Sequence, residues 1–234
     1  MEIKRFEHIS ERHKTSYLSC GPVDAQPIIM LHGWPDLSIG WEEQLKFFGA
    51  QGYHAIAPDM RGYGSSSIPE NHSDYCMREI VEDMIELLSS LGHKEAIWVG
   101  HDWGSPVVWN IALHHPEVVK GLVSLCVSFG WGGHPNSYLS TVNRATYPID
   151  EYPYGQWDYM FFYLDNFELV LEQMEEDLEK FLAITFRRPS DETISMFNTA
   201  EGYKSPTALI TKNGGWFRQD GYQGLNSMPE IAFD

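Results

Sequence analysis

Short apolar runs alternate with segments of helical pattern between residues 15 and 128, and this alternation constrains the fold more than any other feature. The runs that predict strands are residues 15–20, 27–33, 54–60, 95–100 and 122–128. The segments that predict helices are residues 41–51, 75–91 and 106–115. Strands joined by helices pair in parallel, and the helices then cover both faces of the sheet. We therefore predict an α/β fold built on a mostly parallel sheet.

The alternation stops after residue 128, where a glycine-rich stretch (FGWGGHPNSY) follows the last predicted strand. Beyond it the chain is aromatic and helical in pattern, and residues 159–182 form the clearest predicted helix. Residues 207–212 (TALITK) are the single candidate strand in this part. We predict two parts, a core of residues 1–129 and a helical unit of residues 130–234.

The charge and the apolar runs of the chain exclude several classes of partner. Of the 234 residues, 33 are acidic and 16 are basic, which gives a formal net charge of -17 at pH 7. Nucleic acids and anionic membrane surfaces are also negative, so we expect neither as a partner. No apolar run approaches the ~18 residues of a membrane span, and no signal peptide is expected. The three cysteines lack CxxC spacing, which favours reduced thiols in a cytoplasmic protein.

Residues 98–106 read WVGHDWGSP and place a carboxylate, Asp102, directly after a predicted strand. With Gly100 and Gly104 on either side and a helical pattern behind, this is the G-x-nucleophile-x-G form of a nucleophile elbow. The glycines allow a sharp turn in which the central side chain projects freely. Ligands of parallel sheets bind beyond the carboxyl ends of the strands, where Asp102 is expected. Capping of the next helix is the alternative role of Asp102, but capping alone does not require the two glycines.

A carboxylate nucleophile limits the chemistry, and the chain has no G-x-S-x-G motif that would supply a serine instead. Attack on an acyl group would give an anhydride, whereas attack on saturated carbon displaces a leaving group and gives an alkyl ester. Aspartate is ionised at neutral pH, so no base is needed to activate it. We therefore predict a substrate with electrophilic saturated carbon, which is an epoxide or an alkyl halide.

The stretch HGWPD (32–36) follows a predicted strand and forms the second part of the predicted site. In this fold class that loop supplies one backbone N–H to an oxyanion hole, and the residue after the nucleophile supplies another. These residues are Trp34 and Trp103, since Pro35 has no N–H to donate. They would stabilise the oxyanion that forms when water cleaves the ester. His32 and Pro35 are predicted to border the substrate pocket.

The order HGWPD, RGYGSSS (61–67), GHDWGSP (100–106) and an aromatic insertion resembles the epoxide hydrolases of the α/β-hydrolase superfamily over essentially the whole chain. The resemblance implies an α/β-hydrolase fold, with Asp102 as nucleophile, a backbone oxyanion hole at Trp34 and Trp103, and a helical lid after the sixth strand. It also implies a small hydrophobic epoxide as substrate, and neither a metal ion nor an organic cofactor.

The stretch QWDYMFFY (156–163) resembles the segment with the first of two lid tyrosines in that family, one of which hydrogen-bonds the epoxide oxygen. The matching residue is Tyr159, and Tyr163, one turn further, is the alternative. Opening an epoxide forms an alkoxide that is far more basic than phenolate, whose acid has a pKa of about 10, so a phenol can donate to it. Trp157 and Tyr163 are predicted to line the substrate pocket, although such aromatic residues also pack in ordinary cores.

Two other functions stay open. Haloalkane-type dehalogenases use the same aspartate nucleophile, and many of them carry asparagine where Trp34 stands, so this tryptophan favours an epoxide over a halide. Trp103 is shared by both groups and does not discriminate between them. The third hypothesis is a non-catalytic α/β-hydrolase relative that binds an apolar ligand under its lid.

The second half of the family's machinery has no match in the sequence. A histidine oriented by an acid normally activates the water, and both follow the lid in chain order. All ten histidines lie at or before His134, which is the one stray candidate for this base. The resemblance implies that the second lid tyrosine, the late core strands, the acid and the histidine are absent. We expect a missing C-terminal segment, or another chain or a homo-oligomer that supplies the remainder. Residues 1–234 alone are expected to complete at most one turnover, which leaves Asp102 alkylated.

Overall fold

The computed structural model describes residues 1–130, 135–186 and 205–215. The chain divides into two compact units, Met1–Gly132 and Gly133–Asp234. The first unit contains a six-stranded sheet with the order β1-β2-β4-β3-β5-β6. Its strands are β1 (Lys4–Ile9), β2 (Lys14–Cys20), β3 (Pro27–Leu31), β4 (His54–Pro58), β5 (Ala96–His101) and β6 (Val119–Leu125). Its α-helices are α1 (Glu42–Ala50), α2 (Met77–Ser90) and α3 (Gly104–His114).

The sheet is parallel over the strands that matter for the site. Strand β3 pairs in parallel with β4 and with β5, and β5 pairs in parallel with β6, whereas β1 and β2 are antiparallel to their neighbours. In register, Leu31 lies beside Gly100 and His101 lies beside Leu125. The loops that leave β3, β5 and β6 therefore emerge together at one edge of the sheet, as the predicted mostly parallel α/β fold requires.

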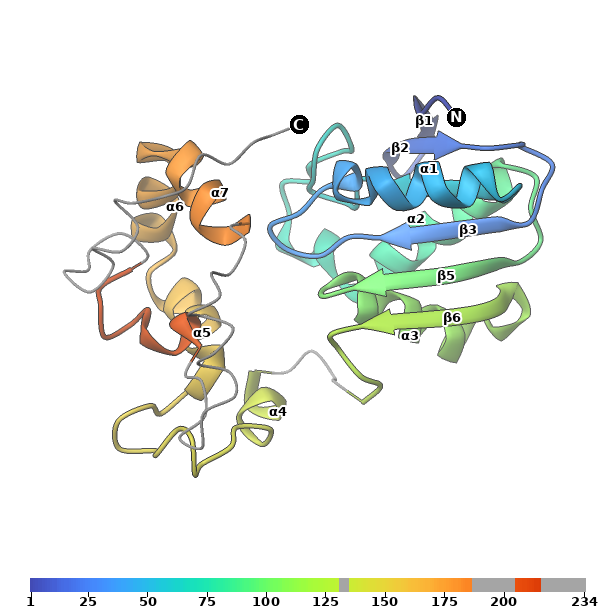
Figure 1. Cartoon of the computed structure of the whole chain (residues 1–234). Helices are drawn as coiled ribbons and strands as arrows, with labels where there is room; N and C mark the ends of the chain where they lie inside the picture. Colours follow the sequence, from blue (N-terminus) through green and yellow to red (C-terminus); the bar gives the residue numbers. More distant parts are fainter. Residues whose placement is uncertain (131–134, 187–204, 216–234) are drawn as a thin grey trace. The chain divides into compact units, whose positions relative to one another are not determined.

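Helices cover both faces of this sheet, with α1 on one face and α2 and α3 on the other (Figure 1). Side chains alternate between the faces along each strand, because successive residues of a strand point to opposite sides. The core that packs with α2 and α3 includes Ile29, Leu31, Ile56 and Trp98. The core on the side of α1 includes Ile28, Met30, Ala55 and Val99. The apolar runs of β3 and β4 are thus strands that are buried on both sides, as expected for central strands of a parallel sheet, whereas the edge strand β6 is partly exposed.

The second unit holds several short helices in its described part. They are α4 (Pro135–Leu139), α5 (Asp158–Asp165), α6 (Phe167–Glu176) and α7 (Leu178–Phe186). Residues 205–215 are held against this unit by hydrogen bonds, one from Thr211 N–H to Asp158 Oδ2 (2.6 Å) and one from Gln173 Nε2 to the Gly214 oxygen (3.0 Å). Among the described helices, none has the length and the apolar character that would let it cross a bilayer.

Two expectations about local structure are wrong, and one strand has no counterpart among the predicted ones. Residues 207–212 are not a strand, because Pro206–Leu209 forms a 3-10 helix. The single helix expected over residues 159–182 is divided into α5, α6 and α7, since the backbone leaves the helical region at Asn166 and Asp177. Strand β1 was not predicted, because nearly all of its residues are exposed and no apolar pattern marks it.

Candidate active site

Asp102 lies between β5 and α3, at the edge where the parallel strands end. Its φ is 49°, in the left-handed region that few residues other than glycine adopt. The backbone N–H of Asp102 donates to the carbonyl oxygen of Leu125 at 3.3 Å, and its own carbonyl accepts from the N–H of Ser105 at 2.9 Å. Neighbouring strands and the start of α3 thus hold this conformation, which is typical of residues that are strained for a functional reason.

The two glycines around Asp102 are required by close backbone contacts. A Cβ on Gly100 would lie 2.4 Å from the carbonyl oxygen of Gly104. A Cβ on Gly104 would lie 2.3 Å from the carbonyl oxygen of Leu31, at the end of β3. No side chain fits at either position without moving the backbone, so the start of α3 packs directly on the ends of β3 and β5. The glycine pattern of the sequence therefore has a steric cause.

The loop after β3 touches the side chain of Asp102. The backbone N–H of Trp34 donates to Asp102 Oδ1 at 2.8 Å. A Cβ on Gly33 would lie 2.4 Å from the Cβ of Asp102, so the loop passes the nucleophile at backbone distance. Asp102 is half-buried, and no hydrogen bond reaches its Oδ2 from the residues that the structure describes. One carboxylate oxygen is therefore held, while the other is available.

The remaining predicted residues of the first unit surround this contact. Trp103 directly precedes α3 and is partly exposed, and N–H groups at the start of a helix have no partner within the helix. Pro35 is half-buried and follows Trp34 through a cis peptide bond. His32 has no exposed surface, and its ring contacts the backbone of Gly33 and Met60.

Tyr63 is a residue that the sequence motifs did not single out. It lies in the loop after β4, and its ring packs edge-on against His32, with the ring centroids 4.9 Å apart. Burial and the nearby negative charge of Asp102 raise the pKa of Tyr63 to about 12, so its phenol stays protonated. The feature of the sequence that could have pointed to Tyr63 is the RGYG pattern around it. Both of its glycines, Gly62 and Gly64, have positive φ, at 87° and 53°. These glycines form a second tight turn beside the elbow.

Asp59 joins the loops that follow β3 and β4. Its buried carboxylate accepts hydrogen bonds from the backbone N–H of Ser38 (3.0 Å) and Ser65 (3.2 Å) and from the guanidinium of Arg5 (2.7 Å). Burial alone would raise the pKa of Asp59, but these hydrogen bonds outweigh it and leave the pKa below its usual value. Asp59 therefore remains an anion that fixes the geometry of both loops.

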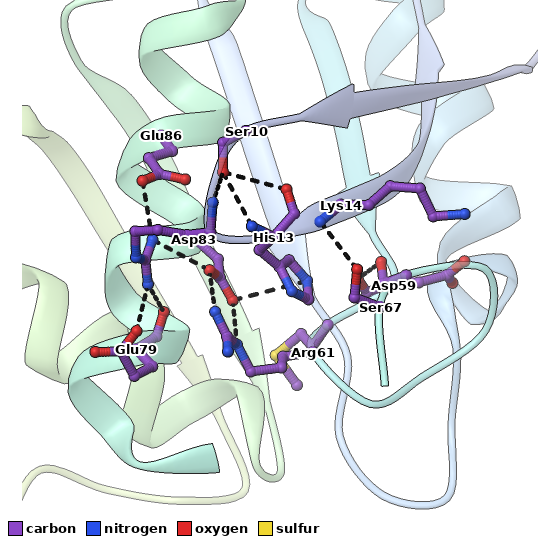
Figure 2. Close-up of polar contacts among 12 residues, drawn as sticks. Ser10, His13, Lys14, Asp59, Arg61, Ser67, Glu79, Asp83 and Glu86 are labelled. Carbon is purple, nitrogen blue, oxygen red and sulfur yellow. Dashed lines mark hydrogen bonds and ion pairs between the residues drawn. The ribbon is translucent and has the colours of Figure 1, made fainter. Parts of the chain in front are cut away.

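A buried ion pair fixes the same loop to α2 (Figure 2). Arg61 donates from Nε and Nη2 to the two carboxylate oxygens of Asp83, with both distances at 2.7 Å. Arg12 lies 3.4 Å from the same carboxylate and also bonds Glu79 and Glu86 on α2. Such bidentate contacts have a defined direction, so they set the path of residues 59–64.

The predicted lid residues belong to the second unit. Tyr159 and Tyr163 lie one turn apart on α5, are both partly exposed, and have ring centroids 5.6 Å apart in an edge-on arrangement. Trp157 directly precedes α5 and donates from Nε1 to Thr141 Oγ1 at 3.1 Å. His134, the stray candidate for a base, lies outside the described residues. Within the described ranges, no group of three or more His, Cys, Asp or Glu side chains could hold a metal ion.

The comparisons with known proteins agree on one family. Residues 26–196 match the family described as alpha/beta hydrolase fold. Epoxide hydrolase A of Mycobacterium tuberculosis is 41% identical over 110 residues, which are 47% of this chain and 34% of that protein. Bifunctional epoxide hydrolase 2 of Sus scrofa is 30% identical over 171 residues, which are 73% of this chain and 29% of that protein.

Solved structures give the same result. A crystal structure of an epoxide hydrolase from Vigna radiata matches with a TM-score of 0.55 and 34% identity, over 66% of this chain and 50% of that one. Epoxide Hydrolase A from Mycobacterium thermoresistibile has a TM-score of 0.67 at 22% identity, over 88% of this chain and 62% of that one, and so shares the fold. The chain spans between 29% and 44% of the length of the curated relatives that it matches. The chain belongs to the alpha/beta hydrolase fold family, and within that family it is similar to the epoxide hydrolases.

Proposed function

We propose that the chain carries the alkylation step of epoxide hydrolysis, with Asp102 as nucleophile. The observation that carries this proposal is the state of the Asp102 carboxylate. Its backbone is strained at a strand end, Oδ1 accepts the N–H of Trp34, and Oδ2 has no hydrogen bond within the described residues. The similarity to proteins named epoxide hydrolase supports an epoxide as the electrophile.

In the first step, Oδ2 of Asp102 attacks a ring carbon of the epoxide. A bond forms between Oδ2 and this carbon, the ring C–O bond breaks, and its electron pair stays on oxygen as an alkoxide. Tyr159 donates its phenolic proton to that oxygen, or Tyr163 does so in its place, and water later restores the phenol. The product is a hydroxyalkyl ester of Asp102.

In the second step, water would add to Cγ of the ester. The negative charge then develops on Oδ1, which already lies 2.8 Å from the N–H of Trp34. Trp103 N–H is the proposed second donor, and donors that are aligned beforehand stabilise such an oxyanion. Collapse of the intermediate would break the Cγ–Oδ2 bond, so that the leaving oxygen takes one proton of the added water to complete the vicinal diol, while the other proton passes to solvent and the carboxylate returns. No histidine follows His134 in the sequence, so we expect residues 1–234 to accumulate the ester.

The test is mass spectrometry of residues 1–234 after incubation with styrene oxide. We expect a mass increase of one epoxide molecule, which peptide mapping places on Asp102, and no increase in an Asp102→Asn variant. Hydroxylamine, which cleaves esters, should remove the added mass. A folded protein whose Asp102 stays unmodified would contradict the proposal.

The same assay separates the other functions. A bromoalkane that alkylates Asp102 and releases bromide faster than styrene oxide reacts would assign a dehalogenase. Saturable binding of the epoxide without any covalent product would assign a non-catalytic relative.

The cysteines Cys20, Cys76 and Cys126 are all free thiols, which supports a reducing compartment such as the cytoplasm.

A further inference from the structure

The loop that carries Trp34 is held by a histidine ring that the proposed chemistry does not use. His32 is fully buried, with Nδ1 2.8 Å from the carbonyl oxygen of Gly33 and Nε2 3.0 Å from the backbone nitrogen of Met60. Gly33 and Trp34 are the residues whose backbone contacts Asp102. The ring therefore fixes the Gly33–Trp34 peptide, which is the same peptide whose N–H holds the nucleophile.

The two partners of His32 fix its protonation state. The N–H of Met60 can only donate, so Nε2 must accept, and the carbonyl of Gly33 can only accept, so Nδ1 carries the proton. A neutral imidazole with its proton on Nδ1 satisfies both groups. A second proton on Nε2 would place two donors face to face and would break the bond to Met60.

The surroundings of His32 are mostly anionic, and the ring still stays neutral. The carboxylates of Asp36, Asp59 and Asp102 favour the charged ring, and the phenol of Tyr63 lies against it. Burial nevertheless lowers the pKa of His32 below its ordinary value, because the charged form loses more hydration than the carboxylates return.

The loop that bonds Nε2 of His32 is itself anchored. Met60 and Tyr63 belong to the loop after β4, where the N–H of Tyr63 donates to the Met60 oxygen at 2.9 Å. Arg61, between them, is fixed to Asp83 on α2 by two hydrogen bonds. The ring is thus held between a loop that is anchored to a helix and a loop that contacts the nucleophile.

We propose that His32 is a positioning residue whose neutral form, with the proton on Nδ1, holds the Gly33–Trp34 segment so that the Trp34 N–H meets Oδ1 of Asp102. This inference deepens the proposed function and rests on it for its kinetic test. In this proposal, the histidine of HGWPD orients the loop that contacts the nucleophile, and the RGYG loop supports that histidine.

Two variants test the two hydrogen bonds of the His32 ring separately. In His32→Asn the side-chain amide nitrogen stands near the place of Nδ1 and can still donate to Gly33. In His32→Gln the amide lies near the place of Nε2, so it can accept from Met60 while the donor to Gly33 is lost. We expect the alkylation rate per folded molecule to fall about tenfold to hundredfold in His32→Gln and less in His32→Asn.

His54→Asn is the matched control. His54 is also a buried histidine with two bonded ring nitrogens, which contact Ser19 (3.0 Å) and His93 (2.8 Å), but it lies at the start of β4, away from Asp102. The His54→Asn variant should be less stable, but Asp102 in its folded molecules should be alkylated at the rate of the unchanged protein. Equal rates in His32→Gln and His54→Asn would overturn the positioning role.

Measurements without substrate separate this inference from the proposed function. Nitrogen NMR of His32 should show the Nδ1–H tautomer at neutral pH, and the Nε2–H tautomer or an imidazolium would overturn the inference. When Asp102→Asn is introduced, the Trp34 amide resonance should shift in the otherwise unchanged protein and in the His32→Asn variant. The shift should be much smaller in the His32→Gln variant. The same shift in all three would also overturn it. This pattern together with no alkylation in any protein would contradict the proposed function alone.

Discussion

The backbone N–H of Trp34 donates a 2.8 Å hydrogen bond to Oδ1 of Asp102, a residue 68 positions later in the chain. The contact joins the loops that leave β3 and β5, two strands that lie side by side in the sheet. Because the parallel sheet brings these loops together, one oxygen of the carboxylate is oriented before any substrate arrives. Such orientation removes part of the entropy cost of the reaction.

Replacing Gly33 by alanine should impair alkylation more than folding. The new Cβ would lie 2.4 Å from the Cβ of Asp102, so the loop and the nucleophile must move apart and the Trp34 contact must lengthen. Overpacking of this kind costs about 1–3 kcal/mol in stability. Styrene oxide labelling of Asp102, corrected for the folded fraction, measures the effect on the site.

Gly121→Ala is the control for that substitution. Gly121 lies in β6, and its added Cβ would meet only Ile97 side-chain atoms at 3.8 Å, an ordinary contact distance. This variant should label at the unchanged rate. If Gly33→Ala labels as fast as Gly121→Ala, the backbone contact at Asp102 has no part in the reaction.

Removing the guanidinium of Arg61 should destabilise the first unit strongly. In Arg61→Met the buried carboxylate of Asp83 keeps Arg12 at 3.4 Å and His13 Nε2 at 3.8 Å but loses both short hydrogen bonds, and the loss of one partner of a buried pair costs about 3–5 kcal/mol. The double variant Arg61→Met with Asp83→Leu should recover much of this loss, because no uncompensated charge remains. Urea unfolding curves give both values.

An exposed ion pair provides the comparison. Lys46 lies 2.7 Å from Glu42, and both side chains are 44% exposed. Lys46→Met should change the free energy of unfolding by less than about 1 kcal/mol. A cost at Arg61 as small as the cost at Lys46 would show that the Arg61–Asp83 pair does not fix the loop after β4.

Acidification should destabilise the first unit through its buried histidines. Burial, and then the neighbouring His93, lower the pKa of His54 from 6.5 to about 4. Between these pH values the unfolded chain binds more protons than the folded chain, so the free energy of unfolding falls as the pH falls. Burial also lowers the pKa of His13, His32 and His93, which adds to the same trend.

Unfolding by urea at a series of pH values checks this trend. Stability from these groups is fully present above the unfolded pKa of 6.5 and is lost as the pH approaches 4. His54→Asn removes one titrating group and should flatten the slope over this range. A slope of the same size in His54→Asn would assign the acid sensitivity to other groups.

The two candidate lid phenols can be distinguished by removing one hydroxyl at a time. If Tyr159 donates to the epoxide oxygen, Tyr159→Phe should slow the labelling of Asp102 about 100-fold or more, because a general acid contributes that much. Tyr163→Phe, one turn away on α5, should then have a small effect. The reverse result would assign the role to Tyr163, and two small effects would exclude both phenols.

The local features of this fold could be read from the sequence, because they depend on residues that are close in the chain. The buried strands and the turn at Asp102 are of this kind, since Gly100 and Gly104 lie within two positions of it. Strand β1 has no such signal, because its pairing with β2 leaves most of its side chains in solvent. The TALITK segment has the composition of a strand, yet Pro206 and the cap by Ser205 begin a 3-10 helix there.

The support of the site could not be read from the sequence. Tyr63 and His32 meet across two loops, and the role of a buried ring depends on partners that only the folded chain brings together. The same holds for Asp59, whose three donors come from separate parts of the chain. The roles of Trp34, Trp103 and Tyr159 in catalysis stay predictions for the experiments above.

The left-handed backbone at position 102 also bears on how this fold changes its chemistry over time. A φ of 49° admits residues with a small or unbranched substituent on Cβ far more readily than threonine, valine or isoleucine. Serine, cysteine or asparagine could therefore replace aspartate without any rebuilding of the turn. A single substitution at this position can therefore remove the carboxylate, and with it the proposed nucleophile, while the surrounding turn keeps its conformation.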